Sequence, residues 1–331
     1  MRRFILVVAL LVGGGMVLHF FGPAEPEADS AQKRERVPFA ADRDAAPQAK
    51  AVAFDGKRAM SYLEAICDIG PRMSGTAGMK RQQELIQKHF EDLGAKVAMQ
   101  EFSARQNSQR RSVPMANMIV SFHPERQRRV ILCSHYDTRP IADQEPDPRK
   151  WRETFVSAND GGSGVALLME LGHHVKDLKT NVGVDFVFFD GEEYIFDRDR
   201  DKYFFGSEHF AQTWKKSKPR VDYAAAILLD MVGGKNARFP AEGYSFARAT
   251  KLVREIWGLA GELGCQAFKD QVGQRVQDDH LALLNAGIPA IDIIDFEYAH
   301  WHRLSDVPAN CSPQSMEQVA RVLGVWLQRT K

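Results

Sequence analysis

Apolar residues along this chain follow two alternating patterns. Apolar positions three or four residues apart predict amphipathic helices, at residues 57–66, 78–93, 165–178, 209–215, 246–263, 280–285 and 316–330. Short runs rich in apolar residues predict strands, at residues 97–102, 116–122, 130–134, 184–189, 224–229 and 290–294. Because most of these strands are separated by helices, the pattern indicates an α/β domain with a mostly parallel sheet and helices on both of its faces.

The first 52 residues do not follow this pattern. Two arginines directly precede an apolar run at residues 4–21, which is long for a signal peptide core and short for a comfortable membrane span. We therefore expect residues 1–21 to be a signal peptide or an N-terminal membrane anchor. Residues 22–52 are rich in Pro, Ala and charge, which predicts a flexible linker before a folded domain at residues 53–331. The protein is then exported, and it is either membrane-anchored or secreted, for example into a periplasm.

Composition and charge narrow the possible classes of function. A hydrophobic content of 44% and a charged content of 26% are typical of a globular protein. The net charge of +1 gives no argument for nucleic-acid binding, and a membrane is expected as a partner only through the N-terminal segment. The basic stretch at residues 126–129 lies between two predicted strands and is interpreted as a solvated hairpin turn. The four cysteines show no zinc-finger or disulfide spacing, and Cys133 is expected to be a buried, unreactive thiol.

Acidic and imidazole side chains follow most of the later predicted strands. They are His135 and Asp137, Asp160, Glu192 and Glu193, Asp230, and His302. The carboxyl ends of parallel strands meet at one edge of a sheet, and open α/β proteins bind their ligands at that edge. Carboxylates and imidazoles that gather there suit a divalent metal ion, above all zinc. The sequence therefore predicts a metal-assisted enzyme that acts on an amide.

Several of these residues also have a purely structural interpretation. Asp160 directly precedes a predicted helix, where Asp is a favoured N-cap. Asp230 could cap the turn at the glycine pair that follows it. His135 could be an ordinary hydrogen-bonded histidine, with Asp137 as the partner that orients its ring.

Glu192 and Glu193 form the sharpest local signal. Two adjacent carboxylates at the end of a buried strand repel each other, and burial makes this repulsion worse. A cation bound to one of them would remove the penalty and leave the other to move protons. A solvated pair in a loop is the alternative interpretation.

Two further groups of residues suggest a substrate pocket. Asp278, Asp279 and His280 precede a short predicted helix, and N-capping accounts for one of them but not for all three. Trp301 stands beside His302 after the last predicted strand, where an aromatic side chain suits a pocket wall.

As an ordered set, these residues carry a family resemblance. HYDT (135–138), NDGGSG (159–164), DGEE (190–193), LLD (228–230) and His302 resemble the zinc peptidases of the M28 aminopeptidase type. More narrowly, GPRMSGTAG (70–78), VFFDGEEY (187–194), QDDH (277–280) and WH (301–302) resemble the glutaminyl-peptide cyclotransferases. The resemblance runs from about residue 56 to the C-terminus. It implies an M28-like catalytic domain with a three-layer α/β fold, in which a mixed, mostly parallel sheet lies between helices.

The resemblance also implies a metal site. In the cyclotransferases, the positions of Asp160, Glu193 and His302 hold one zinc ion. In the di-zinc aminopeptidases, the positions of His135 and Asp230 hold a second zinc, which Asp160 bridges to the first. The expected cofactor is therefore one zinc ion, or two if the chain is an aminopeptidase.

Catalytic and substrate-binding roles follow from the same resemblance. The position of Glu192 is the general acid and base of the cyclotransferases, and those of Asp230 and Asp278 form a carboxylate pair beside the site. Trp301 matches a tryptophan of the pocket wall, and we place Gln277 in the same pocket.

The sequence departs from the animal cyclotransferases in three places. The segment at residues 194–207 lacks their tryptophan, Asp292 stands where they have a histidine, and Cys133 does not match their disulfide. These differences concern the pocket and the exact substrate more than the metal site.

We expect an acyltransferase that converts the N-terminal Gln of peptides or proteins to pyroglutamate and releases ammonia. The alternative is a di-zinc aminopeptidase that hydrolyses N-terminal residues. A binding domain with a degenerate site is disfavoured because every ligand position is filled.

Overall fold

The computed structural model describes residues 51–218 and 220–331. The predicted signal or anchor segment at residues 1–21 and nearly all of the predicted linker lie outside the described residues. The helices are α1 Gly56–Asp68, α2 Ala77–Asp92, α3 Gly164–Val175, α4 Phe205–Lys216, α5 Gly243–Arg248, α6 Thr250–Glu262, α7 His280–Ala286 and α8 Pro313–Arg329. The strands are β1 Lys96–Ala104, β2 Val113–Phe122, β3 Arg128–His135, β4 Gly183–Phe189, β5 Asp222–Asp230, β6 Phe239–Ala241, β7 Phe268–Val272 and β8 Ala290–Ile294.

Within the described residues, the main sheet has six strands in the order β1-β2-β4-β3-β5-β8. Strands β4, β3, β5 and β8 run parallel to one another, because helices lie in the connections between them. Strands β1 and β2 form an antiparallel extension beside β4. The predicted mixed, mostly parallel sheet is therefore confirmed.

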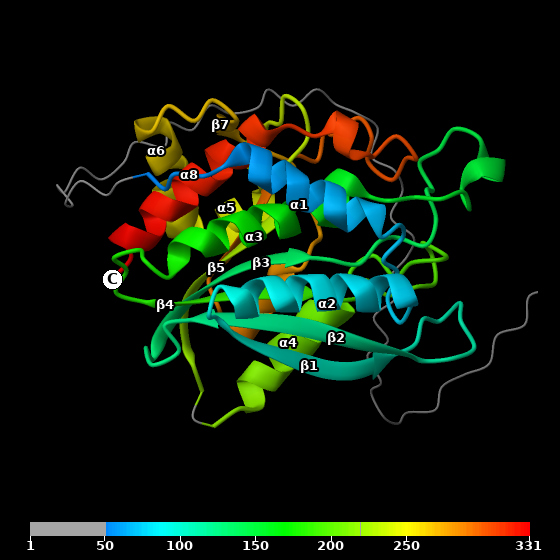
Figure 1. Cartoon of the computed structure of the whole chain (residues 1–331), viewed down its shortest axis with the longest axis horizontal. Coiled ribbons are helices and arrows are strands. Elements are labelled where there is room, and N and C mark those ends of the chain that lie inside the picture. The colour runs from blue at the N-terminus through cyan, green and yellow to red at the C-terminus, as the bar shows by residue number, and fades with distance from the viewer. Residues whose placement is uncertain (1–50, 219) are drawn as a thin grey trace, which may run out of the picture. The chain divides into compact units, whose positions relative to one another are not determined.

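Alternate residues of the central strands bury their side chains on opposite faces of the sheet. Leu132 of β3 packs in a core that includes residues of α1, α3 and α8, which lie side by side in Figure 1. Its neighbours Ile131 and Cys133 pack on the other face, against α4 and α7. Helices cover both faces, as predicted, and Cys133 is a buried free thiol. This layering leaves the carboxyl ends of the parallel strands to form the candidate site.

Residues 126–129 do not form the predicted hairpin turn, although Gln127 and Arg128 are exposed as expected. Strand β2 pairs with β1 and β4, whereas β3 runs beside β4 and β5, so no hairpin joins β2 to β3. Arg129 lies on β3 and is only 4% exposed. Its guanidinium group donates to both carboxylate oxygens of Asp185 on β4, at 2.6 and 2.9 Å. The buried ion pair explains how an arginine is accommodated inside the sheet.

The predicted long helix at residues 246–263 is also wrong, because the chain breaks it at Ala249. This residue leaves the helical conformation, with φ −134° and ψ 40°, and separates α5 from α6. The structure contains in addition a small parallel sheet of β6 and β7, which was not predicted. Strand β6 is only three residues long and includes Pro240, so it carries no alternating pattern.

Candidate active site and metal centre

Three predicted ligands meet at the carboxyl edge of the sheet. Asp160, Glu193 and His302 are almost fully buried, and one ligand atom from each lies within 4.8 Å of the others. Nε2 of His302 is 3.2 Å from Oε1 of Glu193 and 3.4 Å from Oδ2 of Asp160. Among the described residues, Nε2 of His302 and Oδ2 of Asp160 have no hydrogen-bond partner. Two carboxylates and an imidazole with unpartnered buried atoms fit a zinc ion.

A second set shares one of these residues. His135, Asp160 and Asp230 also bring one ligand atom each within 4.8 Å of the others. Nε2 of His135 is 3.0 Å from Oδ1 of Asp160 and 3.3 Å from Oδ1 of Asp230. Asp160 is thus placed between the two sets, one oxygen toward each.

Two residues that the sequence analysis did not single out hold the first set in place. Nδ1 of His302 donates to the carboxylate of Asp143 at 3.0 Å, which directs Nε2 toward the other ligands. The fully buried guanidinium of Arg139 donates to Glu193 at 3.1 Å and to Asp143 at 2.9 Å. His302 itself has a φ of 52°, an uncommon conformation for a residue with a side chain.

The loop that carries the glutamate pair is fixed by Asp137. Its carboxylate accepts the backbone N–H groups of Glu192 at 3.1 Å and Glu193 at 3.0 Å. It also lies 3.7 Å from Nδ1 of His135, which is longer than a hydrogen bond, so its predicted role in orienting that ring stays a prediction. Its hydrogen bonds, however, serve to position the two glutamates.

Asp160 does not cap helix α3. The residue in the cap position is Ser163, whose side chain makes no capping hydrogen bond, and the Asp160 carboxylate faces the two histidines instead. The backbone N–H of Asp160 donates to the buried carboxylate of Asp306 at 3.1 Å. Gly161 follows with a φ of 77°, and a Cβ atom there would lie 2.7 Å from the His135 ring. Only glycine allows this close approach.

Glu192 is the member of the glutamate pair that neither ligand set uses. It is 8% exposed, and its Oε2 atom is 3.8 Å from Nδ1 of His135. Burial raises the pKa of Glu192 well above its usual range, and the neighbouring charge of Glu193 raises it further. A carboxyl group with a raised pKa is suited to take up and release a proton near neutral pH.

Near Glu192 lies a cluster of four acids, of which Asp278, Asp279 and Asp292 are buried and Asp230 is partly buried. Burial, and then the charge of Asp230, raise the pKa of Asp278. Burial and the charge of Asp278 likewise raise the pKa of Asp292, and burial raises that of Asp279 to about 7. Neighbouring acids with raised pKa values share protons at neutral pH, because like charges cannot all be buried together.

A pocket of about 330 Å³ opens beside these residues, and Asp230 and Asp278 of the acidic cluster line it. Its lining includes the three ligands of the first set and Glu192. Phe296 and Trp301 form an aromatic wall, with ring centroids 5.1 Å apart. The exposed side chain of Gln277 also lines the pocket, which is where the sequence analysis placed it.

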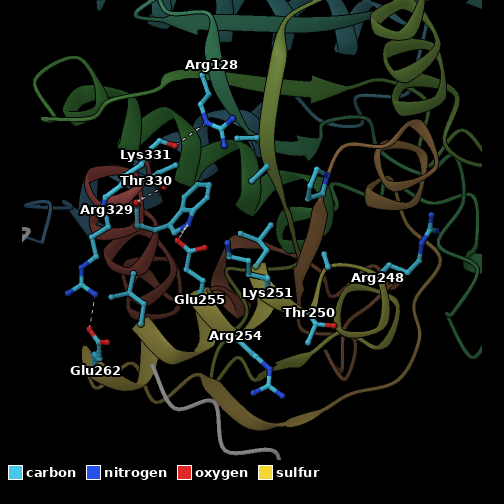
Figure 2. Close-up of a pocket in the computed structure, with 17 residues that line it drawn as sticks. Arg128, Arg248, Thr250, Lys251, Arg254, Glu255, Glu262, Arg329, Thr330 and Lys331 are labelled. Atoms are coloured by element: carbon cyan, nitrogen blue, oxygen red, sulfur yellow. Dashed lines mark hydrogen bonds and ion pairs between the residues drawn. The ribbon is translucent and has the colours of Figure 1, made fainter. Parts of the chain in front are cut away.

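A larger cavity of about 1150 Å³ lies elsewhere, between α6, the end of α8 and the start of β5 (Figure 2). It is rimmed by arginine and lysine side chains, and no histidine lines it. Its two acids are engaged, since Glu255 accepts from Trp326 and Glu262 pairs with Arg329. The larger cavity therefore offers no ligand set for a metal ion.

Comparison with known proteins agrees with this geometry. Residues 117–327 match the family model described as Peptidase family M28. The chain belongs to peptidase family M28. The glutaminyl-peptide cyclotransferase of Bothrops jararaca is 22% identical over 286 residues, which are 77% of this chain and 76% of the relative.

Some solved structures have a higher sequence identity to this chain. The glutaminyl cyclase of Fimbriiglobus ruber is 52% identical, with a TM-score of 0.84 over 87% of this chain and all of its own. A leucine aminopeptidase precursor of Bacteroides thetaiotaomicron is 29% identical, with a TM-score of 0.78 over 86% of this chain and all of its own. The predicted resemblance to the cyclase branch of M28 is thus confirmed.

Proposed function

We propose that this protein is a zinc-dependent glutaminyl-peptide cyclotransferase, which converts an N-terminal Gln to pyroglutamate and releases ammonia. The observation that carries the proposal is the composition of the 330 Å³ pocket. One small pocket combines a three-residue zinc ligand set, a free buried carboxyl group in Glu192 and an aromatic wall. The similarity to glutaminyl cyclases supports the same reaction.

Asp160, Glu193 and His302 would hold the zinc ion, with Asp143 and Arg139 orienting His302 and Glu193. The chemistry that zinc supplies when bound is Lewis-acid polarisation of the substrate's γ-carbonyl group.

Glu192 moves the proton that the reaction requires. The α-amine nitrogen of the substrate forms a bond to the γ-carbon, and the bond from that carbon to the amide nitrogen breaks. One proton passes from the amine to the departing amide nitrogen, so that ammonia leaves. Glu192 takes the proton and returns it, and its raised pKa suits both steps. Because nucleophile and carbonyl belong to one residue, proximity supplies much of the acceleration.

Asp230 and Asp278 orient the amine. Both are placed beside the pocket, and burial raises the pKa of each, so the pair can hold a shared proton and still accept a hydrogen bond from the amine. Trp301 packs against the short Gln side chain and excludes water, which would otherwise compete as a nucleophile. Gln277 lies where it can bind the substrate backbone.

One observation favours a second function. His135, Asp160 and Asp230 form a further possible ligand set, which would suit a second zinc ion and a di-zinc aminopeptidase. The similarity to a leucine aminopeptidase precursor fits this alternative.

Mass spectrometry separates the two reactions. A Gln-initiated peptide should lose the mass of one ammonia, with no peptide bond cut, and leucine amide should stay intact. The same peptide with an acetylated N-terminus is the matched control, because it lacks the attacking amine and should not react. Release of free amino acids without any cyclised product would assign the chain to the aminopeptidases.

A further inference from the structure

Two arginines line the active-site pocket at its solvent side. Arg198 and Arg275 are both exposed, whereas the candidate metal ligands of the same pocket are almost fully buried. They come from different loops, one after β4 and the other between β7 and α7. The pocket is therefore acidic inside and carries positive charge at its entrance.

Arg275 belongs to a loop whose backbone is held on both sides of it. Three hydrogen bonds tie the loop to the connection between β6 and α5. They join Gly273 to the carbonyl of Ala241 at 2.7 Å, Gln274 to Gly243 at 2.9 Å, and Val276 to the carboxylate of Glu242 at 2.9 Å. The position of this arginine at the pocket is thus set by the fold.

The side chain of Arg275 is positioned as well. Its guanidinium group lies over the ring of Tyr244, 5.4 Å from the centroid. Its aliphatic stem occupies a notch at Gly243, where a Cβ atom would lie only 2.7 Å from Cγ of Arg275. A cation held in this way loses little conformational entropy when it binds an anion.

The two arginines differ in whether another residue already pairs with their positive charge. Nε of Arg198 donates to Asp143 at 2.6 Å, and the Gln144 amide, oriented with its oxygen toward Arg198, accepts from the same guanidinium group. Among the described residues, no carboxylate pairs with Arg275. Its charge is therefore available to a ligand in the pocket.

We propose that Arg275, assisted by the positive charge of Arg198, makes the enzyme prefer peptides with a carboxylate side chain at the second or third residue. This proposal rests on the proposed function. The amine of the first residue faces the buried acids, and the next residues run outward at about 3.5 Å each. A substrate with an amine at its start and a carboxylate directly after it complements a pocket that is acidic inside and basic at its entrance.

The test uses the full-length protein with zinc and two sets of amidated pentapeptides. All begin with Gln and otherwise contain Ala, except for a Glu, Gln or Lys at position two or at position three. Ammonia release gives kcat/KM for each peptide. We expect Glu to exceed Gln by about fivefold at one of the two positions, Lys to be the poorest, and the difference to shrink at high salt.

The readout for variants is the ratio of kcat/KM between the Glu and Gln peptides, which is insensitive to a general loss of activity. Arg275→Gln should bring this ratio close to one, and Arg275→Glu should invert it. Arg254→Gln is the matched control, because this exposed arginine lines the distant cavity in Figure 2, and it should keep the wild-type ratio.

The possible outcomes separate this proposal from the proposed function. Cyclisation of all peptides with equal kcat/KM, or a Glu preference that Arg275→Glu leaves unchanged, would overturn the role of Arg275 and leave the enzyme a cyclase. No ammonia release from any peptide would overturn the cyclase assignment, and the specificity proposal with it.

Discussion

At the scale of single residues, the two adjacent glutamates have different surroundings and should respond differently to substitution. Glu192→Gln removes the proton carrier but no proposed ligand, so turnover of a Gln-initiated peptide should fall by roughly a hundredfold or more while the bound zinc is kept. Glu193→Gln removes a proposed ligand and should weaken zinc binding. Activity assays with elemental analysis of each variant check both expectations. Loss of zinc from the Glu192 variant alone would mean that the two roles are reversed.

The ion pair between Arg129 and Asp185 gives a prediction about stability. Arg129→Met leaves the Asp185 carboxylate buried without its cation and should lower the free energy of unfolding by about 3 kcal/mol or more. Urea unfolding followed by circular dichroism measures the change. In the double variant with Asp185→Leu no charge remains unpaired, so it should be more stable than the single variant. A single variant as stable as the wild type would show that the ion pair contributes little.

Functional residues can be recognised in a sequence when the residues next to them in the chain carry the signal. An acid close behind a buried apolar run is visible in a linear sequence, so Glu192, Glu193 and Asp230 could be named as candidates. Their roles stay predictions, although the structure brings the residues together. Arg139 and Asp143 could not be found in this way, since their partners Glu193 and His302 are 54 and 159 positions away. Only the fold creates those contacts.

At the scale of elements, helices α1, α2 and α3 meet at a group of aromatic and imidazole side chains. The rings of His89 and His173 lie 5.3 Å apart, and Tyr62 hydrogen-bonds to His173 at 2.7 Å. Burial lowers the pKa of His89, and the charge of His173 lowers it further. Burial also lowers the pKa of His173, and the charge of Arg58 lowers it further. The negative charge of Glu170 raises the pKa of both histidines, against the effect of burial.

This arrangement predicts a pH-dependent stability. A histidine whose pKa is lower in the folded state takes up protons more readily when unfolded, so its contribution is complete above about pH 6.5 and is lost as the pH falls below it. The two histidines should therefore contribute a decrease in melting temperature between about pH 7.5 and about pH 5.5, whereas the raised pKa values of the buried active-site acids act in the opposite direction. In His89→Gln, whose amide can still donate to the Met169 carbonyl, the decrease should be smaller. Equal slopes for variant and wild type would exclude His89 as a source.

Elements were predictable where the apolar pattern was long and regular. The central strands and helices α1, α2, α3 and α8 lie close to their predicted ranges. The break at Ala249 could not be seen, because residues 246–263 contain no proline and keep a helical period through the break. The buried Arg129 was misplaced for a related reason. A charged residue between two apolar runs suggests a turn, and only the pairing of β3 with β4 shows its partner.

At the scale of the whole molecule, the family resemblance is confirmed, while the location of the protein stays a prediction. Among residues 51–218 and 220–331, no helix combines the length and hydrophobicity needed to cross a bilayer. The predicted signal or anchor segment, the apolar run at residues 4–21, lies outside the described residues. We expect cell fractionation to find the domain exported, with N-terminal sequencing distinguishing cleavage from anchoring. Full-length protein free in the cytosol would contradict this expectation.

The number of zinc ions and the role of His135 decide between the two candidate functions of the whole enzyme. A cyclase should contain about one zinc ion per chain and an aminopeptidase about two.

His135 contacts Asp160 and Asp230 but belongs only to the second ligand set. In a one-zinc cyclase, His135→Ala should keep the zinc ion and reduce cyclisation by less than about tenfold, because Glu192 and the first set stay intact. In a two-zinc hydrolase the same change removes a ligand, so it should release one zinc ion and abolish hydrolysis. Elemental analysis and kcat/KM for Gln-peptide and leucine amide, measured on one preparation, distinguish these outcomes. A variant that stays folded, loses one of two zinc ions and no longer hydrolyses leucine amide would refute the one-zinc cyclase.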